Sequence, residues 1–158
     1  MSGFLDPSVL GDREAAEDAV LRFAESLDDG DFELFRSAFF EDCVVDMSGV
    51  SENVGVMNGR DAAAEKLIGN LGEMDTTHHT SNMRVKFNGD SAELTCYVLA
   101  QHLRPGVGLK PSLDKPYMLR GNRYRAQLER DSDWWRIRHL VIKGVWVLGD
   151  VTLATAAR

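Results

Sequence analysis

The sequence predicts an α+β domain in which helices pack against one face of a strongly curved antiparallel sheet. Apolar residues recur at helical spacing through the first half of the chain, and from Asp75 onward they alternate with polar residues as in half-buried strands. Helices that precede a run of long antiparallel strands are typical of α+β domains.

Three helices are expected before Asp75, with a short strand over residues 44–47 between the second and the third. The first has Asp12 as its N-cap and ends at Gly30, which suits a left-handed C-cap, and Asp31 caps the second. Asp61 caps the third, after a loop rich in Gly, Ser and Asn. The apolar stripes expected to be buried are Ala16, Ala19, Val20, Phe23, Ala24 and Leu27, then Phe32, Phe35, Ala38 and Phe39, then Ala64, Leu67, Ile68 and Leu71.

Long strands are expected after Asp75. Asn88-Gly89 is a strong signal for a hairpin turn between the first two strands. After a loop over residues 104–116, two further strands cover 117–130 and 134–148. No repeat or linker divides the chain, so we expect one domain over residues 1–158 with its core between 12 and 148. The return arm of the hairpin places one set of residues on a common face: Ala92, Leu94, Cys96, Val98, Ala100 and His102.

Composition and charge limit the classes of partner. The 158-residue chain is 44% hydrophobic and 27% charged, as is ordinary for a globular protein, and its net charge of −7 disfavours nucleic acid and anionic membranes. No apolar run approaches the ~20 residues that span a bilayer, and residues 1–10 show no leader pattern. Cys43 and Cys96 stand far apart and are interpreted as two reduced thiols. We therefore expect a cytoplasmic protein.

Asp28 is the first candidate for chemistry. It follows Ala24 by four residues and so projects from the apolar side of the first helix, where a carboxylate needs a partner. The alternative is a solvated acid at a frayed helix end. His102 continues the apolar face of its strand, and is either a functional group or a core histidine bonded to the backbone.

The adjacent residues His78 and His79 pose an ambiguity. Only one of them faces the interior, because successive strand residues point to opposite faces. Counting back from Met83 places His79 on the apolar side, whereas a bulge near the start of the strand would place His78 there.

Asn122 and Tyr124 share the inward face of the next strand. Both offer hydrogen bonds inside an otherwise apolar pocket, although Tyr124 also suits a core aromatic residue. If these side chains converge with Asp28 and the histidines, they form an acid–base site that needs neither metal nor cofactor.

These motifs give the chain a resemblance to the nuclear transport factor 2-like superfamily, and within it to the SnoaL-like and scytalone dehydratase-like branch. The resemblance covers residues 12–148 and rests on the order of loose motifs, and it implies a cone-shaped open barrel, the cystatin-like roll. The motifs are Gly59-Arg60-Asp61, the Thr-His-His-x-x-Asn segment at 77–82, Gly89-Asp90-x-Ala92, Tyr97-x-x-x-x-His102 and Trp135-Arg136-Ile137.

The resemblance also implies residue roles. In this branch an aspartate at the end of the first helix orients a histidine on the central hairpin, and a second histidine lies on the return arm. These positions fall on Asp28, His78 and His102, with His79 in reserve. The implied mechanism is cofactor-independent: His78 removes a proton beside a carbonyl, and His102 assists a leaving hydroxyl or holds an oxyanion.

The implied substrate is small and hydrophobic, such as a polyketide, terpenoid or steroid. The dehydratase binds its substrate carbonyl through two tyrosines, and Leu27 and Met47 stand at those positions, so scytalone itself is not expected. A dehydratase or other lyase fits this set best, with an isomerase or polyketide cyclase as the alternative.

Two other classes of function remain open. Two histidines and one carboxylate are also the ligands of non-haem iron oxygenases, and many domains of this superfamily only bind ligands or associate with partners. Sheets of this superfamily usually pair across subunits, so the resemblance, together with apolar residues on the outer face of the sheet, implies a homodimer or homotrimer. These residues are Tyr97, Leu99, Trp146 and Leu148.

Overall fold

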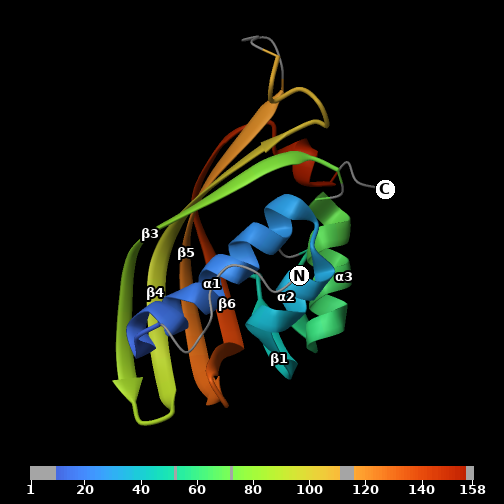
Figure 1. The fold of residues 1–158 in the computed structure, drawn as a ribbon. Coiled ribbons are helices and arrows are strands. Elements are labelled where there is room, and N and C mark those ends of the chain that lie inside the picture. Colours follow the sequence, from blue (N-terminus) through green and yellow to red (C-terminus); the bar gives the residue numbers. More distant parts are fainter. Residues whose placement is uncertain (1–9, 52, 72, 111–115, 156–158) are drawn as a thin grey trace.

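The computed structural model describes residues 10–51, 53–71, 73–110 and 116–155 (Figure 1). Parts of the N-terminal segment, of the loop over 104–116 and of the C-terminal tail lie outside these residues, as do the expectations made for them. The described helices are α1 (Asp12–Asp29), α2 (Phe32–Ala38), α3 (Arg60–Leu71) and the short 3₁₀ helix η2 (Val151–Thr155). The described strands are β1 (Phe39–Asp46), β2 (Val56–Asn58), β3 (Asp75–Asn88), β4 (Ser91–Leu103), β5 (Tyr117–Asp131) and β6 (Trp134–Gly149).

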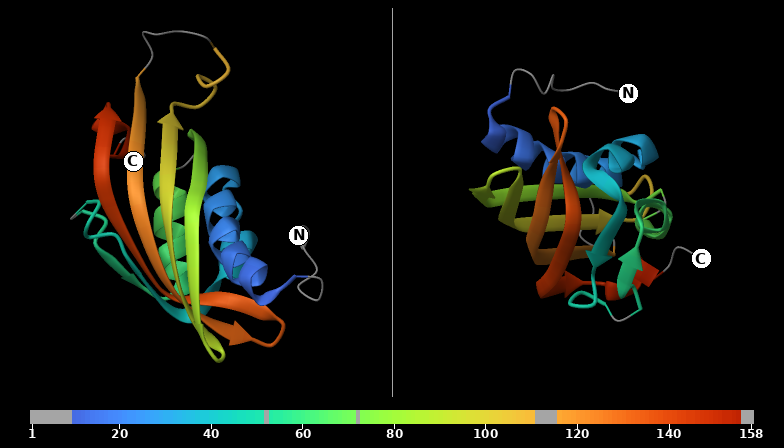
Figure 2. Two further views of the ribbon diagram at one scale, coloured as in Figure 1. Left: turned by 90° about the vertical axis from the view of Figure 1, so that its left-hand side faces the viewer. Right: turned by 90° about the horizontal axis from the view of Figure 1, so that it is seen from below.

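The described strands form one sheet in the order β2-β1-β6-β5-β4-β3. The sheet curls around the helices, which cover its concave face (Figures 1 and 2). This confirms the predicted α+β class. The sheet is mixed, however, because β1 runs parallel to β6 while the other neighbours are antiparallel.

The predicted boundaries of the helices are partly right. Gly30 ends α1 with a φ of 65°, and the Asp31 side chain caps α2 by accepting hydrogen bonds from the amides of Glu33 and Leu34. Asp12 is not an N-cap, because Gly11 takes that position and the Asp12 carboxylate instead accepts a hydrogen bond from Arg130 at 2.7 Å.

Two further expectations for the helices are wrong. The Asp61 carboxylate does not cap α3, because it lies in the first turn and binds Arg36 at 2.9 Å. Phe32 is 36% exposed, since the seven-residue α2 turns only Phe35 and Ala38 into the core. Phe39 is buried as predicted, but as the first residue of β1.

The core lies between α1 and the concave face of the sheet. Phe23 packs edge-on against Phe35 and Phe39, with ring centroids 5.6 and 5.3 Å apart. The six residues predicted to share a face on β4 are all buried. Cys43 and Cys96 are free thiols as predicted, and burial raises their pKa values to about 11 and about 12.

A buried ion pair fastens α1 to its neighbours. The Arg22 guanidinium binds Asp18 at 2.7 Å, and both side chains are about nine-tenths buried. The same guanidinium donates to the carbonyl of Ser37 and, at 2.9 Å, to that of Trp135 at the start of β6. Arg22 therefore links α1 to α2 and to the sheet.

A β-bulge divides β3 into two halves. The pairing with β4 runs without a break from Asp75 to Ser81 and resumes at Arg84, so Asn82 and Met83 together oppose Cys96. Asn82 has a φ of 54°, a left-handed conformation that asparagine adopts more readily than most residues. The extra residue reverses the inward and outward phase between the two halves.

The outer face of the sheet exposes the four apolar residues that were predicted to lie there. Tyr97, Leu99, Trp146 and Leu148 are between 42% and 57% exposed. Assembly into a dimer or trimer through this face remains a prediction. Among the described helices, none has the length and apolar character needed to traverse a bilayer.

Candidate active site

Asp28 lies in the last turn of α1, where the end of the helix meets the N-terminal half of β3. The side chain is about one-fifth exposed, so the alternative of a solvated acid at a frayed end is wrong. Its carboxylate accepts three hydrogen bonds from β3. The donors are the Thr76 hydroxyl at 2.8 Å, the His78 backbone amide at 2.8 Å and the Nδ1 atom of the His78 ring at 2.6 Å. These donors compensate for placing an anion at the negative end of a helix.

The ionised form of Asp28 is favoured in the folded chain. Partial burial by itself opposes ionisation, but the hydrogen bonds from His78 and Thr76 outweigh it and lower the pKa of the carboxyl group. A carboxylate at this distance accepts a proton-bearing nitrogen, so His78 carries its proton on Nδ1. This tautomer leaves Nε2 as a basic nitrogen.

The bulge determines which of the two adjacent histidines faces inward. Upstream of it, His78 points to the concave side with a side chain that is 6% exposed, whereas His79 is exposed on the opposite face. The phase count from Met83 is therefore wrong, and His78 occupies the position that the resemblance selects. His102 lies beside it on β4, with the two imidazole centroids 5.7 Å apart.

His102 is neutral at neutral pH. Burial and, to a smaller extent, the neighbouring His78 lower its pKa from 6.5 to about 4. Its Nδ1 atom is buried and has no hydrogen-bond partner among the described residues. The ring also makes a hydrogen bond with the Met118 backbone, as the alternative of a core histidine predicts, and the unpaired Nδ1 is the atom that remains for a ligand.

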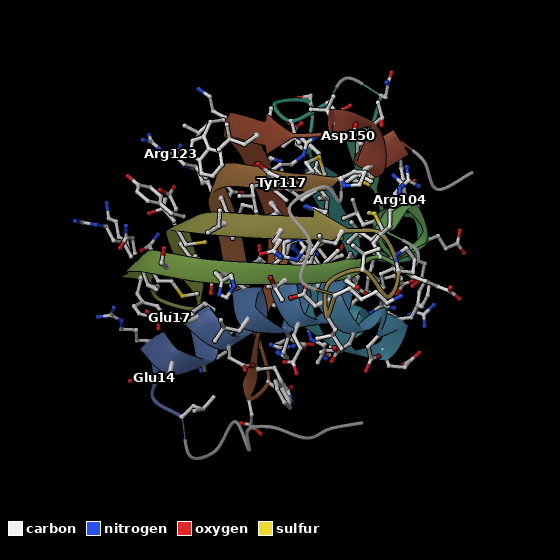
Figure 3. All side chains as sticks on the ribbon, turned by 90° about the horizontal axis from the view of Figure 1, so that it is seen from above. Glu14, Glu17, Arg104, Tyr117, Arg123 and Asp150 are labelled. Atoms are coloured by element: carbon white, nitrogen blue, oxygen red, sulfur yellow. The ribbon has the colours of Figure 1, made fainter. Side chains whose placement is uncertain are left out.

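A cavity of about 720 Å³ lies between the helices and the concave face of the sheet. Figure 3 views the molecule from above, with β3 running beside α1. The walls contain Phe23 and Leu27 of α1, Met47 after β1, and Val147 and Val151 at the end of β6 and in η2. The predicted residues that line it are Leu27, Met47, His78, His102, Asn122 and Tyr124.

Asn122 and Tyr124 supply polar atoms within this largely apolar enclosure. Asn122 is 8% exposed, and its Oδ1 atom is buried without a hydrogen-bond partner among the described residues. Burial raises the pKa of Tyr124, so its phenol stays protonated. Both residues are therefore suited to neutral hydrogen bonding.

Five polar lining residues were not predicted: Ser51 and Asn53 between β1 and β2, Lys66 and Asn70 on α3, and Arg120 on β5. Lys66 and Asn70 are four residues apart and flank the apolar stripe of their helix, a position that is usually solvated. Arg120 has the same strand phase as Asn122 and Tyr124, so the alternation that identified those two also identifies Arg120 as inward-facing.

The described part of the chain contains no group of three or more His, Cys, Asp or Glu side chains arranged to hold a metal ion. Asp28 is turned toward Nδ1 of His78, so this imidazole nitrogen and the carboxylate are used in binding each other.

A curled, open sheet covered by three helices is the architecture of nuclear transport factor 2-like domains. Residues 8–141 match the family model of the SnoaL-like domain. The chain belongs to the SnoaL-like family.

The chain is similar to a fungal protein in sequence and to bacterial proteins in fold. Terrestric acid biosynthesis cluster protein E of Penicillium crustosum is 38% identical over 144 residues, which cover 89% of this chain and 88% of that protein. A Novosphingobium aromaticivorans structure, provisionally named a scytalone dehydratase, has a TM-score of 0.71 at 23% identity, covering 87% of each chain. The hexachlorocyclohexane dehydrochlorinase LinA-type3 of Novosphingobium barchaimii has a TM-score of 0.70 at 18% identity, covering 88% of this chain and 90% of that one. The two structures share the fold.

Proposed function

We propose that this protein is an acid–base enzyme of secondary metabolism that works without a cofactor. Its substrate is a hydrophobic polyketide-, terpenoid- or steroid-like molecule, and its reaction is a dehydration or a related elimination. The observation that carries this proposal is the 2.6 Å contact between Asp28 and Nδ1 of His78, at the wall of the cavity. The relative from the terrestric acid cluster supports the metabolic setting.

The reaction begins with His78. Asp28 fixes the tautomer and stabilises the imidazolium that forms when Nε2 removes a proton from the carbon beside a carbonyl. The electrons of the broken C–H bond form the new double bond, and the C–O bond to the leaving hydroxyl breaks. That hydroxyl takes the proton from Nε2 of the His78 imidazolium and leaves as water, which restores the neutral base.

His102 stabilises the carbonyl oxygen of the substrate, which gains negative charge when the neighbouring carbon loses its proton. Because its pKa is about 4, it acts as a neutral hydrogen-bond donor rather than as an imidazolium. Asn122 and Tyr124 orient the substrate from the adjacent strand. The same first step also serves double-bond isomerisation and cyclisation, and the product distinguishes them, since only dehydration releases water.

Proton abstraction can be tested before the natural substrate is known. Wild-type protein in heavy water is expected to exchange the α-protons of polycyclic ketone probes, followed by NMR. His78→Ala is expected to lose this activity by a factor on the order of 10²–10⁴, and Asp28→Asn to lose it with the fold intact. His79→Ala is the matched control, because His79 is exposed on the other face of the same strand. If His78→Ala exchanges these protons as fast as wild type, the proposed mechanism is wrong.

A further inference from the structure

The cavity contains a guanidinium that the proposed reaction does not use. Arg120 lies on β5 and is half-buried, yet it forms no ion pair with any described residue. Among the described residues, the hydrogen-bond partner of its Nε atom is the Met118 sulfur at 3.3 Å, which is a weak acceptor. A partly desolvated cation without a counter-ion is unfavourable unless a ligand supplies the charge.

The position of Arg120 relative to the base is set by the register of the sheet. His78 pairs with Ala100, and Ala100 pairs with Arg120, so the three residues form one row across β3, β4 and β5. All three line the cavity. Two strand spacings separate the backbones of His78 and Arg120 by about 10 Å, and the small Ala100 side chain leaves the space between them open.

The charges around the cavity favour an anion. The described residues that line the cavity include two cations, Lys66 and Arg120, and no carboxylate. Lys66 already donates to the carbonyls of Asn53 at 3.5 Å and Val54 at 2.7 Å, so Arg120 is the cation with more unused donors. Burial lowers the pKa of Arg120, as expected of a guanidinium held without an anion.

We propose that Arg120 binds an ionised oxygen group of the substrate, a carboxylate or an ionised enol, while Asn122 accepts a hydrogen bond from a neighbouring hydroxyl. Asn122 lies two residues away on the same face, and its buried Oδ1 lacks a partner among the described residues. The substrate class is thus a hydrophobic body with an acidic head group. This inference rests on the proposed function only for the statement that the ligand is also the substrate.

Binding of matched probes tests the inference without turnover. Naphthoate and naphthamide have nearly the same shape and differ in charge, and both are titrated into the protein by calorimetry. Wild type is expected to bind naphthoate about tenfold or more tightly than naphthamide, as a charge-assisted pair provides. Arg120→Met is expected to remove this preference, and Arg120→Lys to keep part of it.

Arg123→Met is the matched control. Arg123 belongs to the same strand but lies on the outer face over the Tyr97 ring, 5.1 Å from its centroid (Figure 3). This variant is expected to bind both probes as wild type does. Melting temperatures establish that each variant is folded, and if Arg120→Met does not fold, the wild-type preference decides the question.

His78→Ala is also expected to bind naphthoate more tightly than naphthamide, because this preference does not depend on proton transfer. The binding result therefore stands apart from the exchange experiment on His78. Equal affinity of wild type for the two probes, or an unchanged preference in folded Arg120→Met, would overturn the inference.

Discussion

Acidification below neutral pH is expected to destabilise the fold through His102. In the unfolded chain this imidazole takes up a proton near its ordinary pKa of 6.5, whereas burial holds the pKa at about 4 in the folded protein. Between these values the unfolded state binds more protons, so the free energy of unfolding falls as the pH falls. The contribution is fully present above about pH 6.5 and is lost by about pH 4.

The difference between these two pKa values corresponds to about 3 kcal/mol. That is a large part of the ~5–15 kcal/mol by which domains of this kind are stable. Asp28 acts at lower pH, because its pKa is below the ordinary 3.8 and its contribution is lost only as the pH falls below that value. The two groups therefore affect separate pH ranges.

Urea denaturation followed by tryptophan fluorescence measures this effect at a series of pH values. His102→Asn is expected to lose less stability than wild type between about pH 6.5 and about pH 4. His79→Asn removes a histidine from the same strand pair without removing a buried one, and is expected to follow wild type. Parallel stability curves for wild type and His102→Asn across this range would refute the reasoning.

Two further predictions concern stability. Asp18→Asn leaves the buried Arg22 guanidinium without its anion and is expected to lower the free energy of unfolding, measured by urea denaturation, by about 3 kcal/mol or more. Glu17→Gln, in an exposed pair with Arg13, is expected to have little effect. Equal losses of stability in the two variants would contradict the role given to Arg22. Gly149→Ala is expected to destabilise by more than ~1 kcal/mol, because Gly149 has a φ of 88° and a Cβ would lie 2.0 Å from the Tyr117 carbonyl oxygen. Gly69→Ala, in α3 with nothing within 4 Å of the added Cβ, is expected to raise the melting temperature instead.

The sequence was sufficient to predict the arrangement of the elements and most of the site. The change from helical to alternating periodicity located the helices and the long strands, because each period directly reflects backbone geometry. The alternation on β4 and β5 placed His102, Asn122 and Tyr124 on the inner face, where the structure has them.

Other features depend on contacts between distant segments. The parallel pairing of β1 with β6 joins residues almost a hundred positions apart, and nothing local to either strand records it. The exposure of Phe32 follows from how a helix of one or two turns is seated, which its own pattern leaves open. Arg120 has the same strand phase as Asn122 and Tyr124 but was not predicted as a site residue, because its cavity does not exist until the helices cover the sheet.

The bulge at Asn82 has a consequence for how relatives of this chain are compared. The identity of the inward histidine depends on whether the extra residue between Thr80 and Arg84 forms a bulge, and not on the chemistry of any of these residues. A regular strand of the same sequence would turn His79 inward in place of His78, with every functional group still present. An alignment that closes this insertion therefore assigns the base to the wrong column, and chain length at this point is as informative about function as the two histidines themselves.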